Sequence, residues 1–127
     1  MVTLQLPYPP SINHHYSYVR GRPVLSKEAR SYRRRVRSLL AHQKVESLTG
    51  PLAVRIEMYP PDKRRRDCDN VQKAVLDALQ QGGLFWDDSQ VVWLLTQKKE
   101  RRRGGAIYLT CQSFDQSNQI ANEGDIE

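Results

Sequence analysis

The chain has 127 residues, the size of one ordinary domain, so one small core must support whatever the protein does. All 20 Lys and Arg residues lie at or before Arg103, so residues 1–114 carry 20 positive and 10 negative charges, a net charge of +10. This charge favours polyanionic partners, either acidic small molecules or nucleic acid. No apolar run reaches the roughly 20 residues that span a bilayer, and no signal-peptide pattern is present, so we expect a cytoplasmic protein without a membrane partner.

The first half of the chain predicts a strand, a long loop and a basic helix. Apolar and polar residues alternate over residues 2–6, which is typical of a strand, and Pro7 ends it. Residues 7–24 are rich in Pro and polar side chains and predict a loop. From Ser26, a candidate N-cap, to about Val45, apolar residues recur at helical spacing. The opposite face of this predicted helix is almost entirely arginine.

The middle of the chain predicts a strand followed by an amphipathic helix. Residues 52–59 alternate as a strand. The helix buries residues at the i, i+3, i+4, i+7 and i+8 positions, namely Val71, Ala74, Val75, Ala78 and Leu79. Asp69 and Gln72 resemble a capping box at its start, and the pair Gly82 and Gly83 provides its end.

The last part of the chain predicts a hairpin and a tail. Residues 90–98 and 106–111 are two strand patterns, and the glycines between them favour a hairpin turn. Beyond Phe114 the sequence becomes polar and acidic, so residues 115–127 predict a disordered tail after a domain of residues 1–114. The fold class is therefore α+β: a single small domain with the order β-α-β-α-β-β and two helices packed on a mixed sheet.

The two cysteines, Cys68 and Cys111, are too few for a disulfide framework and are not spaced as a zinc site, so we expect reduced thiols.

Residues 62–73 combine a basic run, two carboxylates and a lysine. Asp67 and Asp69 point the same way in an extended backbone and can share one hard cation. Lys73 lies one helical turn after Asp69, so its ammonium can reach the same space. Downstream, Asp87 and Asp88 lie in a turn. If that turn folds back over the helix start, it completes a cluster of three or four carboxylates.

Carboxylates repel phosphate, so their place among arginines makes most sense if a divalent metal neutralises them. Mg²⁺ or Mn²⁺ bridging carboxylate and phosphate oxygens is the chemistry of phosphodiester hydrolysis. Lys73 would then stabilise charge in the transition state or position the attacking water. A structural interpretation remains open for each residue alone: Asp69 as an N-cap, Asp67 paired with a neighbouring arginine, and the two later acids as ordinary turn residues.

Three basic runs in so short a chain predict contacts with phosphates. The candidate nucleic-acid-binding residues are Arg33, Arg34, Arg35, Arg64, Arg65, Arg66, Arg101, Arg102 and Arg103. The aromatic residues Phe85, Trp86, Trp93 and Tyr108 fit a core better than a base-stacking surface. Phe85 or Trp86, beside the acidic turn, could insert into a DNA junction.

The strings RRRDCDNVQKAVLDAL and GLFWDDSQVV, with LPYPPSINHHY near the N-terminus, resemble the RusA family of Holliday-junction resolvases over nearly all of residues 3–113. The resemblance implies an endodeoxyribonuclease that depends on Mg²⁺, with Mn²⁺ as a substitute. It assigns the metal-binding carboxylates to Asp67, Asp69 and Asp88 and the catalytic lysine to Lys73, and it leaves Asp87 as an additional candidate ligand. It further implies a homodimer that makes paired symmetric nicks in four-way-junction DNA, in recombination and DNA repair.

Two other interpretations remain open. The chain could be a non-catalytic basic DNA-binding protein, in which case divalent metal acts only by screening charge. It could also be a metal-dependent nuclease that acts on flaps, forks or RNA.

A four-way junction is two-fold symmetric, so a dimer presents one site to each of two equivalent strands. We expect its interface on the apolar strand residues 91–95 and 107–109.

Overall fold

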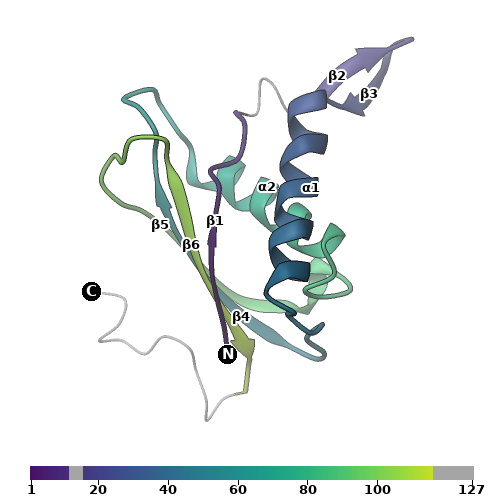
Figure 1. Ribbon diagram of the computed structural model, residues 1–127, viewed down its shortest axis with the longest axis vertical. Coiled ribbons are helices and arrows are strands. Elements are labelled where there is room, and N and C mark those ends of the chain that lie inside the picture. The colour runs from purple at the N-terminus through teal and green to yellow at the C-terminus, as the bar shows by residue number, and fades with distance from the viewer. Residues whose placement is uncertain (12–15, 116–127) are drawn as a thin grey trace.

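The computed structural model describes residues 1–11 and 16–115, so nearly all of the predicted tail lies outside the described residues. Two helices cover one face of a four-stranded sheet, and a separate two-stranded hairpin projects from the first helix (Figure 1). The sheet holds β1 (Val2–Leu6), β4 (Leu52–Tyr59), β5 (Val91–Lys98) and β6 (Ala106–Ser113). The helices are α1 (Lys27–His42) and α2 (Cys68–Gln81). The α+β class and the two-helix mixed sheet predicted from the sequence are confirmed.

Helix α1 begins where the sequence predicts. The Ser26 side chain accepts a hydrogen bond from the Ala29 backbone N–H at 3.1 Å, which satisfies one of the free donors of the first turn. The buried face of α1 holds Ala29, Tyr32, Val36 and Leu40, and α1 packs chiefly against α2. Among the described residues, neither helix is long and apolar enough to cross a bilayer.

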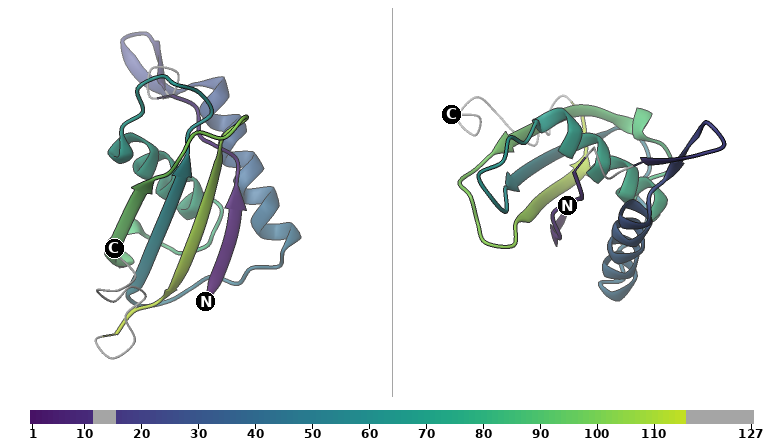
Figure 2. Two further views of the ribbon diagram at one scale, coloured as in Figure 1. Left: turned by 90° about the vertical axis from the view of Figure 1, so that its left-hand side faces the viewer. Right: turned by 90° about the horizontal axis from the view of Figure 1, so that it is seen from above.

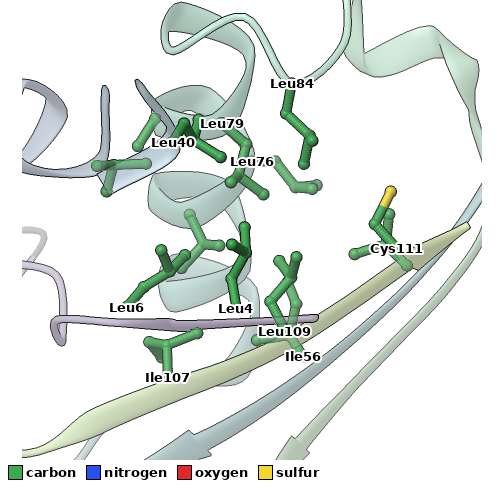
Figure 3. Close-up of a cluster of buried hydrophobic side chains, with 14 of the residues drawn as sticks. Leu4, Leu6, Leu40, Ile56, Leu76, Leu79, Leu84, Ile107, Leu109 and Cys111 are labelled. Carbon is green, nitrogen blue, oxygen red and sulfur yellow. The ribbon is translucent and has the colours of Figure 1, made fainter. Parts of the chain in front are cut away.

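Helix α2 and the sheet enclose the main core. Buried leucines of α2, including Leu76 and Leu79, meet Leu4 of β1 and Leu109 of β6 in one cluster (Figure 3). Cys111 completes this cluster as a fully buried thiol. Side chains of β4 alternate between this core and the uncovered face of the sheet, as the period of two predicts.

The predicted hairpin of the last two strands is wrong. The sheet order is β1-β6-β4-β5, so β4 lies between β5 and β6 (Figure 2). Strand β5 pairs parallel to β4 because α2 carries the chain back across the sheet, whereas β6 pairs antiparallel to the other edge of β4. The connection from β5 to β6 passes over the end of β4. There the Lys99 N–H donates to the Met58 carbonyl, and the Arg102 N–H donates to the Pro60 carbonyl.

The segment predicted as a loop, residues 7–24, contains most of a hairpin that the sequence analysis did not predict. Strands β2 (Tyr16–Val19) and β3 (Arg22–Leu25) pair only with each other among the described strands. Arg20 and Gly21 form the two-residue turn with φ of 53° and 75°, the positive values of a type I′ turn. The sequence analysis did not predict this hairpin, because each strand is only four residues long and Arg-Gly is not among the usual turn pairs.

Candidate active site

Asp67 and Asp69 lie at the end of the sheet where β4 finishes and α2 begins. Helix α2 starts at Cys68, with Asp67 at the N-cap position, although the Asp67 side chain makes no capping hydrogen bond. The predicted capping box of Asp69 with Gln72 is therefore wrong, and Gln72 instead accepts a hydrogen bond from the Thr96 hydroxyl at 2.7 Å. Neither carboxylate is needed to cap the helix by the usual bond, and both are accessible to solvent.

The loop before α2 is held by an ion pair and an aromatic ring. The Arg66 guanidinium donates to both Asp62 carboxylate oxygens at 2.8 and 3.0 Å and lies over the Tyr8 ring, 5.8 Å from its centroid. The Arg64 backbone N–H also donates to Asp62, and this bond, together with Arg66, lowers the pKa of the Asp62 carboxyl. The sequence analysis missed the roles of Asp62 and Tyr8, although the i, i+4 spacing of Asp62 and Arg66 was available as a signal.

A cavity of about 450 Å³ opens beside Asp67. Residues 8–11 line one side of it, and residues 65–67 with Asn70 line the other. Burial raises the pKa of the Tyr8 hydroxyl, so this group stays protonated and can act only as a neutral hydrogen-bond partner. The proline-rich segment near the N-terminus therefore forms one wall of the cavity beside Asp67, although the two segments lie far apart in the sequence.

Lys73 lies on the exposed side of α2. Its ammonium is 3.7 Å from an Asp77 oxygen, and Arg33 of α1 reaches the same oxygen at 3.7 Å. Asp77 therefore joins Lys73 to the arginine-rich helix. The Lys73 side chain remains two-thirds exposed, so it can approach a substrate phosphate.

The second acidic segment is a rigid turn before β5, in which Asp88 begins a short 3₁₀ helix, η2 (Asp88–Gln90). Gln90 accepts hydrogen bonds from the Trp86 and Asp87 N–H groups at 2.8 and 3.1 Å, and it donates to the Leu48 and Gly50 carbonyls at 3.2 and 3.0 Å. The sequence analysis assigned Gln90 no role, although its position three residues after Asp87 is that of a capping box.

The two acids of this turn have different surroundings. The Asp87 carboxylate caps the turn and accepts a hydrogen bond from the Ser89 hydroxyl at 2.8 Å, which lowers the pKa of Asp87. Asp88 is anchored through its backbone, whose N–H donates to the Gln80 side chain at 3.1 Å. Asp87 thus has a structural task, while the Asp88 carboxylate projects from a fixed backbone.

The turn does not fold back over the start of α2. Asp88 is bonded to Gln80 near the end of α2, whereas Asp69 lies in the first turn, eleven residues earlier, or about 16 Å along the helix axis. This separation follows from the topology, because parallel β4 and β5 require α2 to run back from one end of the sheet to the other. Accordingly, no group of three acidic, His or Cys side chains within residues 1–11 and 16–115 is close enough to hold a metal ion.

The predicted basic runs divide into exposed and occupied arginines. The Arg65 side chain is 92% exposed, 3.6 Å from Asp67, while the Arg66 side chain is only 14% exposed. Arg102 lies 4.1 Å from the Tyr59 ring centroid and donates to the Tyr108 hydroxyl at 2.7 Å. Neither group tests phosphate binding, which stays a prediction for all nine arginines: Arg33, Arg34, Arg35, Arg64, Arg65, Arg66, Arg101, Arg102 and Arg103.

The aromatic candidates are also separated by burial. Phe85 is 1% exposed and belongs to the core, so it cannot insert into DNA. Trp86, its neighbour, is 81% exposed, so the expectation that it belongs to the core is wrong. Trp93 and Tyr108 are partly buried on the sheet.

Comparisons with known proteins identify the family of the chain. Residues 7–111 match the family model described as endodeoxyribonuclease RusA. The chain is 41% identical over 109 residues to the crossover junction endodeoxyribonuclease RusA of Escherichia coli strain K12, covering 85% of this chain and 91% of that protein. The identity to the Shigella sonnei protein of the same name is also 41% over the same shares. It is 42% over 108 residues for the protein of that name from Enterobacteria phage 82, covering 84% of this chain and 90% of the relative. The chain belongs to the RusA family of endodeoxyribonucleases.

Proposed function

We propose that this chain is a metal-dependent endodeoxyribonuclease that acts in the cytoplasm and resolves four-way DNA junctions by paired, symmetric phosphodiester hydrolysis in recombination and DNA repair. The observation that carries the proposal is the exposed pair Asp67 and Asp69 at the start of α2, in a chain 41% identical to named crossover junction endodeoxyribonucleases. The net charge of +10 over residues 1–114, from 20 basic and 10 acidic residues, supports a polyanionic substrate.

Asp67 and Asp69 have the chemistry to hold Mg²⁺, for which Mn²⁺ can substitute. Mg²⁺ is commonly bound by one or two carboxylates, with waters and substrate phosphates as the remaining ligands, so two accessible carboxylates fit it. When bound, the metal supplies charge neutralisation and a water of lowered pKa. Lys73 is paired with Asp77 on the exposed side of α2. Its ammonium contributes positive charge near the DNA phosphate that becomes more negative during the reaction.

We assign Asp88 to the same reaction through a second copy of the chain. Within one chain, Asp88 lies at the far end of α2 from Asp69, about 16 Å away along the helix axis. A homodimer in which the two copies of α2 run antiparallel brings Asp88 of each chain toward the Asp67 and Asp69 pair of the other. Asp87, which caps its own turn, is then a supporting residue rather than a ligand.

The free edge of β5 supports this arrangement. Strand β5 is the edge strand next to β4, and Val92 on it is 55% exposed. Two copies of β5 paired about a two-fold axis run antiparallel, so the turn before β5 of one chain meets the end of β5 of the other, where α2 starts. Residues 107–109 of β6 were also expected in the interface. That expectation is wrong, because Ile107 and Leu109 are fully buried beneath the helices.

The proposal is tested with labelled four-way junction, replication fork, linear duplex, single-stranded DNA and an RNA duplex, each in Mg²⁺, Mn²⁺ or EDTA. We expect paired nicks in the junction with either metal, no cutting in EDTA, and junction binding under all three conditions. Binding without cutting in any metal would identify a non-catalytic DNA-binding protein. Equal cutting rates on forks or RNA would identify a nuclease of another specificity.

A further inference from the structure

The β2–β3 hairpin carries apolar side chains that nothing in the described part of the chain covers. Tyr18 is 74% exposed and Val19 is 55% exposed, and both lie beside the tight turn at the tip. Two-stranded hairpins without a core are only marginally stable in water. Exposed apolar residues gathered on a projecting element are typical of a binding surface. Figure 2 shows the hairpin extending away from the body of the molecule.

The charge of the hairpin indicates which partner it fits. Residues 16–25 contain Arg20 and Arg22 and no acidic residue. Trp86 is also strongly exposed, but it adjoins Asp88 of the proposed active site, and residues 84–92 contain no Lys or Arg that could meet a phosphate beside the ring. An aromatic ring flanked by arginines therefore favours nucleic acid, because the bases can stack on the ring while the guanidinium groups meet phosphates.

A basic stripe on α1 continues from the base of the hairpin. The Arg30 guanidinium donates to the Leu25 carbonyl at 3.0 Å, which ties the end of β3 to the helix. Arg30, Arg33, Arg34 and Arg37 share one face of α1 at the i, i+3, i+4 and i+7 positions and line a cavity of about 290 Å³ together with Leu25 and Gln81.

Arg33 gives independent support for an anionic ligand at this stripe. Its Nε–H is buried and has no hydrogen-bond partner among the described residues. The ion pair of Arg33 with Asp77, at 3.7 Å, is made by a different nitrogen, and the same Asp77 oxygen also pairs with Lys73. A phosphate oxygen entering the cavity can satisfy the buried donor, since buried N–H groups are rarely left unpaired.

The hairpin is also close to the proposed active site. Pro10 lines the cavity beside Asp67 and a second cavity, of about 470 Å³, that is also lined by Lys27 at the start of α1. Lys27 lies two residues after the end of β3. A DNA strand in the active site therefore passes near the base of the hairpin.

We propose that the β2–β3 hairpin enters the exchange point of the four-way junction, where Tyr18 stacks on a base, while the arginine stripe of α1 holds phosphates of the adjacent arm. The proposal rests on the proposed function, since it takes the junction as substrate. Bases at an exchange point are open to an inserted side chain at less cost than bases within a continuous duplex. Tyr18 then selects branched over linear DNA, and the arginines contribute affinity for both.

The test compares Tyr18→Ala with Tyr18→Phe, which keeps the ring. Affinity for four-way junction and for linear duplex is measured in EDTA, with 2-aminopurine at the exchange point reporting unstacking. We expect Tyr18→Ala to lose roughly 10- to 100-fold in junction affinity and the fluorescence increase, with duplex affinity unchanged, whereas Tyr18→Phe matches the wild type. The double variant Arg20→Ala with Arg22→Ala should lower the slope of log affinity against log salt by up to about 2 on both DNAs.

The result that overturns the proposal is a Tyr18→Ala chain that opens and binds the junction as the wild type does, or that loses junction and duplex affinity equally. A Tyr18→Ala chain that loses its dimer mass in light scattering would instead make the hairpin a subunit contact and would also refute the proposal. Failure of the proposed function looks different. In that case the wild-type chain still opens the junction in the fluorescence assay but does not cut it in Mg²⁺.

Discussion

Replacing Gln90 by Ala should disturb the position of Asp88 more than it disturbs the fold. Gln90 makes four hydrogen bonds that fix the acidic turn, two from N–H groups of the turn and two to carbonyls of the segment before β4. A hydrogen bond contributes about 1 kcal/mol net, and water can replace the exposed partners here, so we expect a loss of stability of only about 1–2 kcal/mol. That loss corresponds to a fall in Tm of about 5–10 °C.

The expected effect on the reaction is larger. A displacement of about 1 Å at a reacting group can lower the rate by roughly 100-fold, so Gln90→Ala should lower the kcat for junction cutting by roughly 10- to 100-fold. The Kd for junction in EDTA should stay unchanged, because Gln90 carries no charge that meets phosphate. Gln5→Ala, at an exposed glutamine on β1, serves as the control. Normal cutting by a Gln90→Ala chain with a lowered Tm would show that the position of this turn does not matter, and would remove Asp88 from the active site.

Four further predictions concern other parts of the molecule. Asp69→Asn should lower the cutting rate by at least about 100-fold while junction affinity stays equal or rises, as judged by single-turnover kinetics and binding in EDTA; normal cutting would refute the assignment. Iodoacetamide at neutral pH should alkylate Cys68 and spare Cys111, because burial closes access to Cys111 and raises the pKa of its thiol to about 11; mass spectrometry showing two adducts on the folded chain would contradict this. Stability should fall as pH rises toward about 11, since the Cys111 thiol ionises first in the unfolded chain, and denaturant midpoints across that range check the sign. Replacing both Arg101 and Arg103 by Ala should lower the salt slope of binding by up to about 2, and an unchanged slope would exclude them as phosphate contacts.

Local patterns in the sequence were sufficient to predict the elements that bury a continuous face. Helix α1 begins at its predicted cap, Ser26, and β1 and β4 occupy their predicted residues, because burial at a period of 3.6 or 2 is a strong constraint. Pairing between strands was not predicted correctly. Two strands joined by a glycine-containing turn have the same local pattern whether they pair directly or admit β4 between them.

For the candidate site too, the sequence predicted local features but not how distant segments are arranged. The sequence identified Asp67, Asp69, Lys73 and Asp88 as the chemically distinctive residues, and their roles remain predictions. It could not show that α2 separates Asp88 from the others, because that follows from the parallel pairing of β4 and β5. It also did not indicate that Asp62, four residues before Arg66, accepts two hydrogen bonds from the Arg66 guanidinium, whose contact with phosphate stays a prediction.

The most direct test of a shared active site mixes two inactive chains. Asp69→Asn and Asp88→Asn chains are each expected to be inactive alone. In a heterodimer of the two, one site carries both substitutions and the other carries none, so the mixture should recover nicking of one strand of the junction in Mg²⁺. A mixture that stays inactive, although mass measurement shows that heterodimers have formed, would contradict the account, because sites formed within single chains would each retain one substitution.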